Sequence, residues 1–275
     1  MKRILITGNA GYIGSHLSKL LSTEYHVYGM DQSENIAPVV SHSLTNICNL
    51  TPVDMPFDTV IHLAALVQVN ESVRDPINYY NTNINGTLKV LKNIKFNNFV
   101  FASTGTAEHC HSPYGISKRA AEDCVRQVCE EAHVGYTIFR FYNVIGSDGF
   151  LPTNPDGLFY NLIKARETGE FTIFGNDYDT PDGTCIRDYV HVNEICDALR
   201  TAIEKPSNSI ECLGHGVGYT VAEILNKFKE VNNIPNINLL TKIGPRRRGD
   251  LASSVLAEVS PYMKNLYSIE QLLKV

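Results

Sequence analysis

Short apolar runs alternate with longer amphipathic segments along the first half of this 275-residue chain. The runs typical of buried strands are Ile4–Thr7, His26–Met30, Thr59–Ala64, Phe99–Ser103 and Tyr136–Phe141. The segments with helical periodicity are Ile13–Ser22, Asn83–Ile94 and Tyr114–Ala132. Such alternation indicates βαβ units, so we predict an α/β protein with a Rossmann-like parallel sheet flanked by helices.

The regular alternation of apolar runs and amphipathic segments ends after Asn143. Residues 146–157 contain three glycines and two prolines, which favours a loop and the start of a second, smaller mixed α/β lobe. A helix is expected near Leu158–Thr168, and residues 188–204 are expected to return to the first domain through a strand at Val190–Val192. The predicted division is therefore a first domain over 1–145, with 188–204, and a lobe over 146–187 and 205–275.

Composition narrows the class of protein. The net charge is -5, which favours neither nucleic acid nor an anionic membrane surface as a partner. Seven scattered cysteines are typical of free thiols, and the first strand near Met1 leaves no room for a signal peptide, so we expect a soluble cytoplasmic protein. His109-Cys110-His111 is not expected to bind metal, because adjacent residues do not easily converge on one ion.

Three glycines with the spacing GxxGxxG follow the first predicted strand, at Gly8, Gly11 and Gly14. Glycines allow the backbone to approach a pyrophosphate, and the N-terminus of the following helix offers unpaired N–H groups. Asp31 ends the second strand, where a carboxylate accepts ribose hydroxyls and repels a 2′-phosphate, which favours NAD over NADP. The alternative is a glycine-rich turn without a ligand.

A tyrosine and a lysine lie one helical turn apart at Tyr114 and Lys118. The positive charge of the lysine is expected to lower the pKa of the tyrosine, which is about 10 in model peptides. Ser103 and Thr104 end a strand whose carboxyl end should open onto the cofactor crevice. With the glycine motif, this predicts redox chemistry at a sugar or alcohol carbon. The alternative is an aromatic helix start beside a solvated lysine.

Several segments resemble the extended short-chain dehydrogenase/reductase superfamily, namely TGNAGYIGSH (7–16), SPYGISK (112–118) and RFYNVIG (140–146). The block FGNDYDTPDGTCIRDYVHV (174–192) is similar to UDP-glucose 4-epimerases, as are residues 71–73, 79–80, 83–87 and 245–250. This resemblance implies NAD-dependent epimerisation at C4 of a nucleotide sugar through a 4-keto intermediate. The expected substrates are UDP-glucose and UDP-galactose or their N-acetyl forms, bound by the smaller lobe.

The resemblance also assigns site residues. It implies that the catalytic residues are Thr104, Tyr114 and Lys118. The cofactor-binding residues that it implies are Gly8, Gly11, Tyr12, Ile13, Gly14, Asp31, Asn46, Ile47, Leu63, Ala64, Ala65, Asn83, Ser103, Tyr114, Lys118 and Phe141. The implied substrate-binding residues are Thr104, Tyr114, Asn143, Arg187, Arg247, Asp250 and Ser254.

Two of these substrate residues suit a diphosphate on physical grounds. Arg187 and Arg247 can clamp it through charge-assisted hydrogen bonds, although a basic run such as Arg246–Arg248 is more often a solvated surface. The small Ser254 stands at a position that influences tolerance for an N-acetyl group at C2, so we expect that the larger sugars are admitted.

The chain departs from the family pattern at several positions. Only nine residues separate Thr104 from Tyr114, and Val67 stands where the family usually has a lysine. Two alternatives remain open: another nucleotide-sugar reductase or dehydratase, and a catalytically silent NAD-binding module. Gly105-Thr106 lacks the Asp-Glu pair usual in dehydratases. The resemblance further implies a homodimer through the helices at 83–94 and 114–132.

Overall fold

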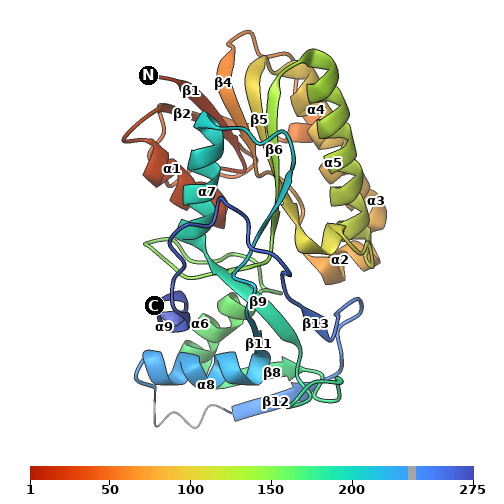
Figure 1. Ribbon diagram of the computed structural model, residues 1–275, viewed down its shortest axis with the longest axis vertical. Helices are drawn as coiled ribbons and strands as arrows, with labels where there is room; N and C mark the ends of the chain where they lie inside the picture. The colour runs from red at the N-terminus through yellow and green to blue at the C-terminus, as the bar shows by residue number, and fades with distance from the viewer. Residues whose placement is uncertain (235–239) are drawn as a thin grey trace. The chain divides into compact units, whose positions relative to one another are not determined.

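The computed structural model describes residues 1–234 and 240–275, which form two compact units (Figure 1). Unit 1 comprises Met1–Phe141 and Ile195–Glu211, and unit 2 comprises Tyr142–Glu194 and Cys212–Val275. The predicted return of the chain at 188–204 therefore begins seven residues late, at 195, and extends to 211.

Unit 1 is built around a seven-stranded sheet that confirms the predicted fold class. Its order is β10 (Ile210–Leu213), β6 (Gly135–Phe141), β5 (Phe96–Thr104), β4 (Phe57–His62), β1 (Arg3–Thr7), β2 (His26–Asp31) and β3 (Ser41–Leu44). The strands from β6 to β3 pair in parallel. The strand order reverses between β1 and β4, which is where ligands bind in open α/β sheets.

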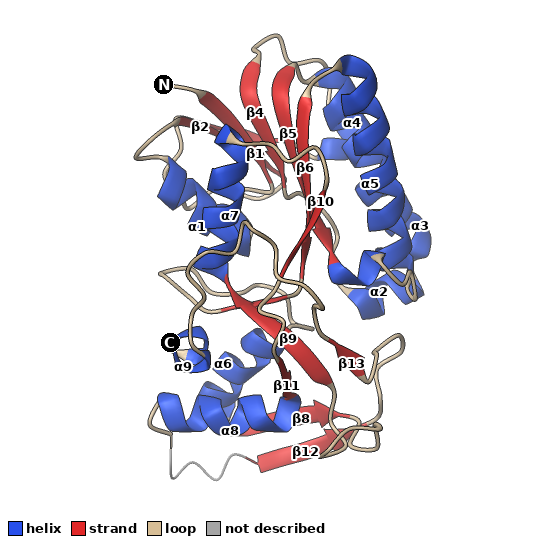
Figure 2. Ribbon diagram, in the orientation of Figure 1, coloured by secondary structure: helices blue, strands red, loops and turns tan. Residues whose placement is uncertain are grey.

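Helices cover both faces of this sheet, as Figure 2 shows. One face carries α4 (Gly86–Asn93) and α5 (Pro113–Ala132), and the other carries α1 (Tyr12–Leu21) and α7 (Val192–Glu204). The shorter α2 (Val69–Arg74) and α3 (Pro76–Tyr80) precede a π-helical turn. Burial on both faces explains why the central strands read as continuous apolar runs.

The π-helical turn occupies Asn81–Asn85, where the sequence predicted the start of one regular helix. The sequence did not predict two of the strands, because neither has a buried apolar run. β3 is mostly exposed, and β10 lies at the sheet edge. The predicted strand Thr59–Ala64 ends earlier, at His62.

Unit 2 contains a mixed four-stranded sheet centred on β9 (Ile186–His191). Its partners are β7 (Asn143–Ile145), β11 (Gly218–Thr220) and β13 (Ser253–Ser254). A second sheet pairs β8 (Glu170–Phe174) with β12 (Leu240–Gly244), and the helices are α6 (Leu158–Thr168), α8 (Val221–Val231) and α9 (Ile269–Leu273). The prediction that Val190–Val192 joins the main sheet is wrong, because its apolar run pairs within unit 2.

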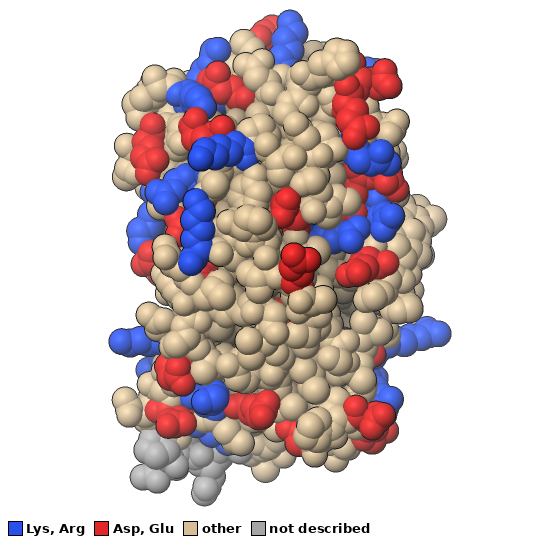
Figure 3. Space-filling view, viewed as in Figure 1, with Lys and Arg blue, Asp and Glu red and all other residues tan. Residues whose placement is uncertain are grey.

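The described residues carry both signs of charge, and no helix among them has the length and apolar character needed to cross a bilayer. On the face drawn in Figure 3, acidic and basic side chains are interspersed, without a continuous patch of either sign among the residues described. This distribution agrees with the small net charge of the sequence.

A buried carboxylate fixes β9 within unit 2. Asp188 is fully buried, and its oxygens accept hydrogen bonds from the backbone N–H groups of His215 (2.8 Å), Gly216 (2.8 Å) and Leu256 (3.2 Å). Gly214 is required beside it, since a Cβ there would lie 2.7 Å from an Asp188 oxygen. Asp188 thus fastens two loops to the strand that carries Arg187.

We expect Asp188→Asn to destabilise the protein by about 2–4 kcal/mol, because an amide replaces one of the two accepting oxygens with a donor. Urea denaturation measures this change. Asp179→Asn, at an exposed position, is the matched control and should leave the free energy of unfolding unchanged. Equal stability of the Asp188 variant and the parent would show that the three backbone contacts contribute nothing.

Candidate active site

The glycine turn after β1 is closely packed against the backbone. Gly8 has a φ of +77°, and a Cβ on it would lie 2.6 Å from the backbone nitrogen of Ala64. A Cβ on Gly14 would lie 2.1 Å from the carbonyl oxygen of Gly8. Gly11 caps α1, whose first turn contains Tyr12 and Ile13. This cradle, which any side chain would fill, fits the pyrophosphate of a dinucleotide at a helix N-terminus.

Asp31 lies beside this turn at the end of β2. One of its carboxylate oxygens accepts a hydrogen bond from the Ala10 N–H (3.1 Å), and the other accepts from Ser33 (3.0 Å). Asn46 follows β3 and is exposed, whereas the neighbouring Ile47 is buried against α4. Asp31 and Asn46 thus lie at or just after the ends of the adjacent strands β2 and β3, and Ile47 packs into the core beside them.

The loop after β4, with Leu63, Ala64 and Ala65, is held by Asn83. The Asn83 amide oxygen accepts from the Leu66 N–H (2.9 Å), and its nitrogen donates to the Leu66 carbonyl (3.0 Å) and to Ser117 Oγ (2.9 Å). Asn83 is buried in the π-helical turn, a feature frequent at functional sites. These contacts hold the loop after β4 against the π-helical turn.

Thr104 and Tyr114 come together at the carboxyl end of β5. Thr104 is the last residue of β5, and Tyr114 lies in the first turn of α5, whose N-cap Ser112 accepts from the Gly115 N–H (3.1 Å). A hydrogen bond joins Thr104 to Tyr114. Of the nine intervening residues, Gly105–Ala107 form a short 3₁₀ turn and Pro113 already begins α5. Phe141, at the end of β6, is the register partner of Thr104.

The electrostatics differ from the sequence prediction. Burial raises the pKa of Tyr114 to about 12, although the hydrogen bond from Thr104 opposes this rise. Burial also lowers the pKa of Lys118 to about 7, and the negative charge of Glu122 opposes that change. The net pKa of Tyr114 is therefore raised in this structure, where the sequence predicted a lowering, because burial disfavours both charged forms and outweighs the stabilisation expected from Lys118.

Two predicted site residues face the core of unit 1. The Lys118 ammonium lies 4.2 Å from the centroid of the Phe101 ring, a cation–π contact. The Ser103 hydroxyl donates to a carboxylate oxygen of Glu122 at 2.5 Å, so this proton is already committed within the protein.

In unit 2, two arginines gather around one carboxylate. Arg247 Nε donates to Asp250 at 3.1 Å, and an Arg187 nitrogen lies 3.7 Å from the other Asp250 oxygen. Ser254 is the register partner of Arg187 across β13 and β9. Asn143 donates to the carbonyl oxygen of Asp188 at 3.0 Å. The structure thus brings together the predicted substrate residues of this unit, and Arg247 is not a solvated surface charge.

Sequence reasoning missed Phe174 and Thr106. The Phe174 ring is 36% exposed, and the Arg247 guanidinium carbon lies 4.9 Å from its centroid, which makes an aromatic platform beside the arginines. Thr106 Oγ1 lies 3.2 Å from Thr104 Oγ1, within hydrogen-bond distance of the hydroxyl that the sequence predicts to be catalytic. Phe174 opens the block that most resembles the epimerases, and this was the available signal. No cluster of three metal-ligating side chains occurs in residues 1–234 and 240–275.

The burial of Lys118 leads us to predict how the free energy of unfolding depends on pH. A lysine whose pKa is lowered on folding opposes folding fully below pH 7, and this penalty disappears above pH 10.5, where the unfolded lysine is also neutral. We expect Lys118→Met to gain roughly 2–4 kcal/mol at pH 6, at about 1.4 kcal/mol per pKa unit, and little near pH 11. Chemical denaturation at both pH values measures the difference, with the exposed Lys89→Met as control. A gain independent of pH would contradict the assignment.

Comparisons with known proteins agree with this geometry. UDP-glucose 4-epimerase from Haemophilus influenzae is 32% identical over 302 residues, which cover 91% of this chain and 88% of that protein. The human UDP-glucose 4-epimerase is 30% identical over 311 residues, covering 92% and 87%.

Solved structures give the same picture. UDP-glucose 4-epimerase from Bifidobacterium longum, in complex with NAD+ and UDP, has a TM-score of 0.85 at 27% identity, with 98% of this chain and 96% of that chain covered. The Thermotoga maritima enzyme with UDP-glucose has a TM-score of 0.81 at 28% identity, covering 99% and 96%. The model of the NAD dependent epimerase/dehydratase family matches residues 4–212. The chain therefore belongs to the NAD-dependent epimerase/dehydratase family.

Proposed function

We propose that this protein is an NAD-dependent epimerase that inverts C4 of a UDP-hexose and so interconverts UDP-glucose and UDP-galactose. The observation that carries the proposal is that Thr104 and Tyr114 lie together at the carboxyl end of β5. The glycine turn follows the carboxyl end of β1 in the same parallel sheet. The activity of the similar enzymes supports the substrate class, and so do the NAD+ and UDP bound in the Bifidobacterium longum structure and the UDP-glucose bound in the Thermotoga maritima structure.

The residues of unit 1 supply proton transfer. Tyr114 takes the proton of the sugar 4-hydroxyl, and Thr104, which is hydrogen-bonded to Tyr114, orients that hydroxyl. The Lys118 ammonium stabilises the phenolate that this step requires. NAD held at the glycine turn would supply the acceptor for the hydride of C4 and the donor that returns it to the opposite face of the 4-keto sugar. Tyr114 then returns the proton, so the reaction needs no external reductant.

NAD fits the residues that would hold it. Gly8 and Gly14 leave room only for bare backbone at the turn, which suits the pyrophosphate, and Asp31 stands where it accepts hydrogen bonds from a ribose. The turn and the α1 N-terminus supply N–H donors, and Asp31 favours NAD because its charge repels a 2′-phosphate.

The residues of unit 2 supply nucleotide binding. Arg187 and Arg247 bind the diphosphate, and Asp250 keeps both guanidinium groups in place through its two oxygens. The exposed Phe174 ring offers a stacking surface to a planar base. Anchoring the nucleotide in this way leaves the hexose free to present either face, which inversion requires.

Two finer proposals concern assembly and location. A homodimer through α4 and α5 is supported by exposed apolar side chains at Leu88, Ile116 and Val128. A cytoplasmic location is supported by seven cysteines, all within the described residues, that form no disulfide. The dehydratase alternative is less well supported, because Gly105 and Thr106 provide no carboxylic acid beside Thr104.

We expect purified protein to interconvert UDP-galactose and UDP-glucose without added reductant, and Tyr114→Phe to lower kcat by about 10²–10⁴-fold, the usual contribution of a general acid–base. Product analysis by chromatography measures both. Tyr25→Phe is the control, since this half-exposed tyrosine donates to Glu204 on the surface. An active parent with an equally active Tyr114→Phe would refute the assigned base, and an inactive parent would refute the substrate.

Ser254 generates a prediction about the sugar. It is small and half-buried beside Arg187, so we propose that UDP-N-acetylhexoses are also substrates. Ser254→Tyr should lower kcat/KM for UDP-N-acetylgalactosamine by at least about tenfold relative to UDP-galactose, because the ring occupies space for the acetyl group. Kinetics with both sugars decide this, with Ser253→Tyr at the exposed neighbour as control. An unchanged ratio in the variant would remove the proposal.

A further inference from the structure

We propose that Arg140 is a positioning residue that holds the carboxylate of Glu122 away from Lys118 and leaves the Lys118 ammonium available to Tyr114. The inference rests on the proposed function, since it concerns the residues assigned to proton transfer. It adds Arg140, on β6, and Glu122, on α5, to those residues.

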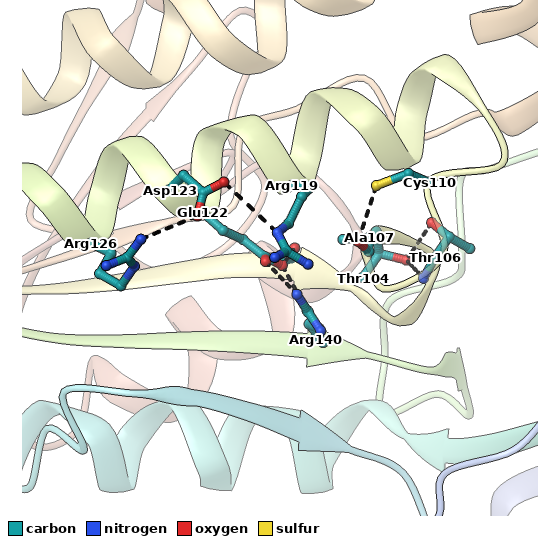
Figure 4. Close-up of polar contacts among 10 residues, drawn as sticks. Thr104, Thr106, Ala107, Cys110, Arg119, Glu122, Asp123, Arg126 and Arg140 are labelled. Atoms are coloured by element: carbon teal, nitrogen blue, oxygen red, sulfur yellow. Dashed lines mark hydrogen bonds and ion pairs between the residues drawn. The ribbon is translucent and has the colours of Figure 1, made fainter.

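Both carboxylate oxygens of Glu122 accept hydrogen bonds from residues other than Lys118. Glu122 lies on α5 with 1% of its surface exposed, and one of its oxygens accepts from Arg140 Nε at 2.9 Å and from Ser103 Oγ at 2.5 Å. The other oxygen accepts from Arg140 Nη2 at 2.7 Å. Figure 4 shows this two-point contact between α5 and β6. Such a fork is the strongest geometry available to an arginine and a carboxylate.

Lys118 does not form the ion pair that its spacing from Glu122 would lead one to expect. A lysine and a glutamate four residues apart on a helix are neighbours and commonly pair. Within the described part of the chain, however, no ion pair joins Lys118 to Glu122, and the ammonium lies over the Phe101 ring instead. Arg140 occupies the carboxylate and so explains why the expected pair does not form.

The other charged and titratable groups near Lys118 do not replace Glu122. His62 on β4 is fully buried, and burial together with the charge of Lys118 lowers its pKa to about 3, so it is neutral. Tyr114 precedes Lys118 by one turn of α5, and Arg140 on β6 is the cation paired to Glu122. Arg119 and Asp123 pair with each other on the exposed face of α5. Glu122 is therefore the carboxylate that competes for the ammonium.

The same contact aligns the strand and the helix that carry the catalytic groups. Ser103 and Arg140 are register partners of β5 and β6, and Glu122 binds both from α5. The next residue of β5 is Thr104. One carboxylate thus fixes Tyr114 and Lys118, on the helix, relative to Thr104, on the strand.

The test follows the ionisation of Lys118 directly, in protein labelled with ¹³C at lysine Cε. The signal, assigned with Lys118→Arg, should titrate near pH 7 in the parent. In Arg140→Met the released carboxylate pairs with Lys118, so the midpoint should rise by at least about one pH unit. In Glu122→Gln the negative charge is lost and the midpoint should fall. Opposite shifts from two variants that break the same contact are not expected from a merely structural role.

Kinetics supply the second readout. Arg140→Met should lower kcat for UDP-galactose by at least about tenfold and leave KM within about threefold, because the nucleotide is bound by other residues. The double variant Glu122→Gln with Arg140→Met removes both charges, so kcat should recover to within about fivefold of the parent. Arg126→Met is the matched control, since this arginine of α5 pairs with Asp123 and Glu130 on the surface.

Two results would overturn the proposal: a Lys118 midpoint that Arg140→Met leaves unchanged, or a folded double variant as inactive as the single one. If Arg140→Met fails to fold, Glu122→Gln and the double variant still decide, because the proposal requires a lowered midpoint in the first and substantial activity in the second. The titration does not depend on turnover. An inactive parent with the expected shifts would therefore contradict the proposed function and leave the role of Arg140 intact.

Discussion

The buried carboxylate of Glu122 makes the contacts on which the proposed catalytic site depends. It receives Arg140 through a fork and Ser103 through a short hydrogen bond, so α5, β5 and β6 meet at one point. An ion pair in the interior adds little net stability compared with apolar packing, but removing one partner leaves an uncompensated charge. The main effect of the Glu122–Arg140 ion pair is to fix the position of α5 relative to β5 and β6.

The proposed cofactor site and the proposed nucleotide-sugar site rely on different physical interactions. The cofactor turn depends on the absence of side chains, because a Cβ at Gly8 or Gly14 would collide with backbone. The proposed nucleotide binding in unit 2 depends on charge, and Asp250 already pairs with both Arg187 and Arg247 in the protein alone. Such preorganisation lowers the entropy lost on binding. The turn and the arginine cluster are thus shaped by folding, and little of either needs to be built by the ligand.

Sequence patterns predicted those parts of the protein in which one local rule dominates. The glycine spacing required a close backbone approach, and the apolar runs required a buried parallel sheet; both are properties of short segments. The strand at Val190–Val192 was misplaced because the length of a run does not say which sheet it joins. The π-helical turn at Asn81–Asn85 was missed because its pattern of residues is that of an ordinary helix.

The most consequential omission was of a different kind. Glu122 and Arg140 lie 18 positions apart and belong to a helix and a strand, and no periodicity links them. Their relation exists only once α5 lies on the sheet. The same holds for the acid–base balance of the site, since the spacing of Tyr114 and Lys118 shows that they are neighbours but not that they are buried. Burial decides their pKa values, and it arises from packing over the whole of unit 1. A sequence motif therefore identifies which groups react, whereas the fold around it sets the charge with which they do so.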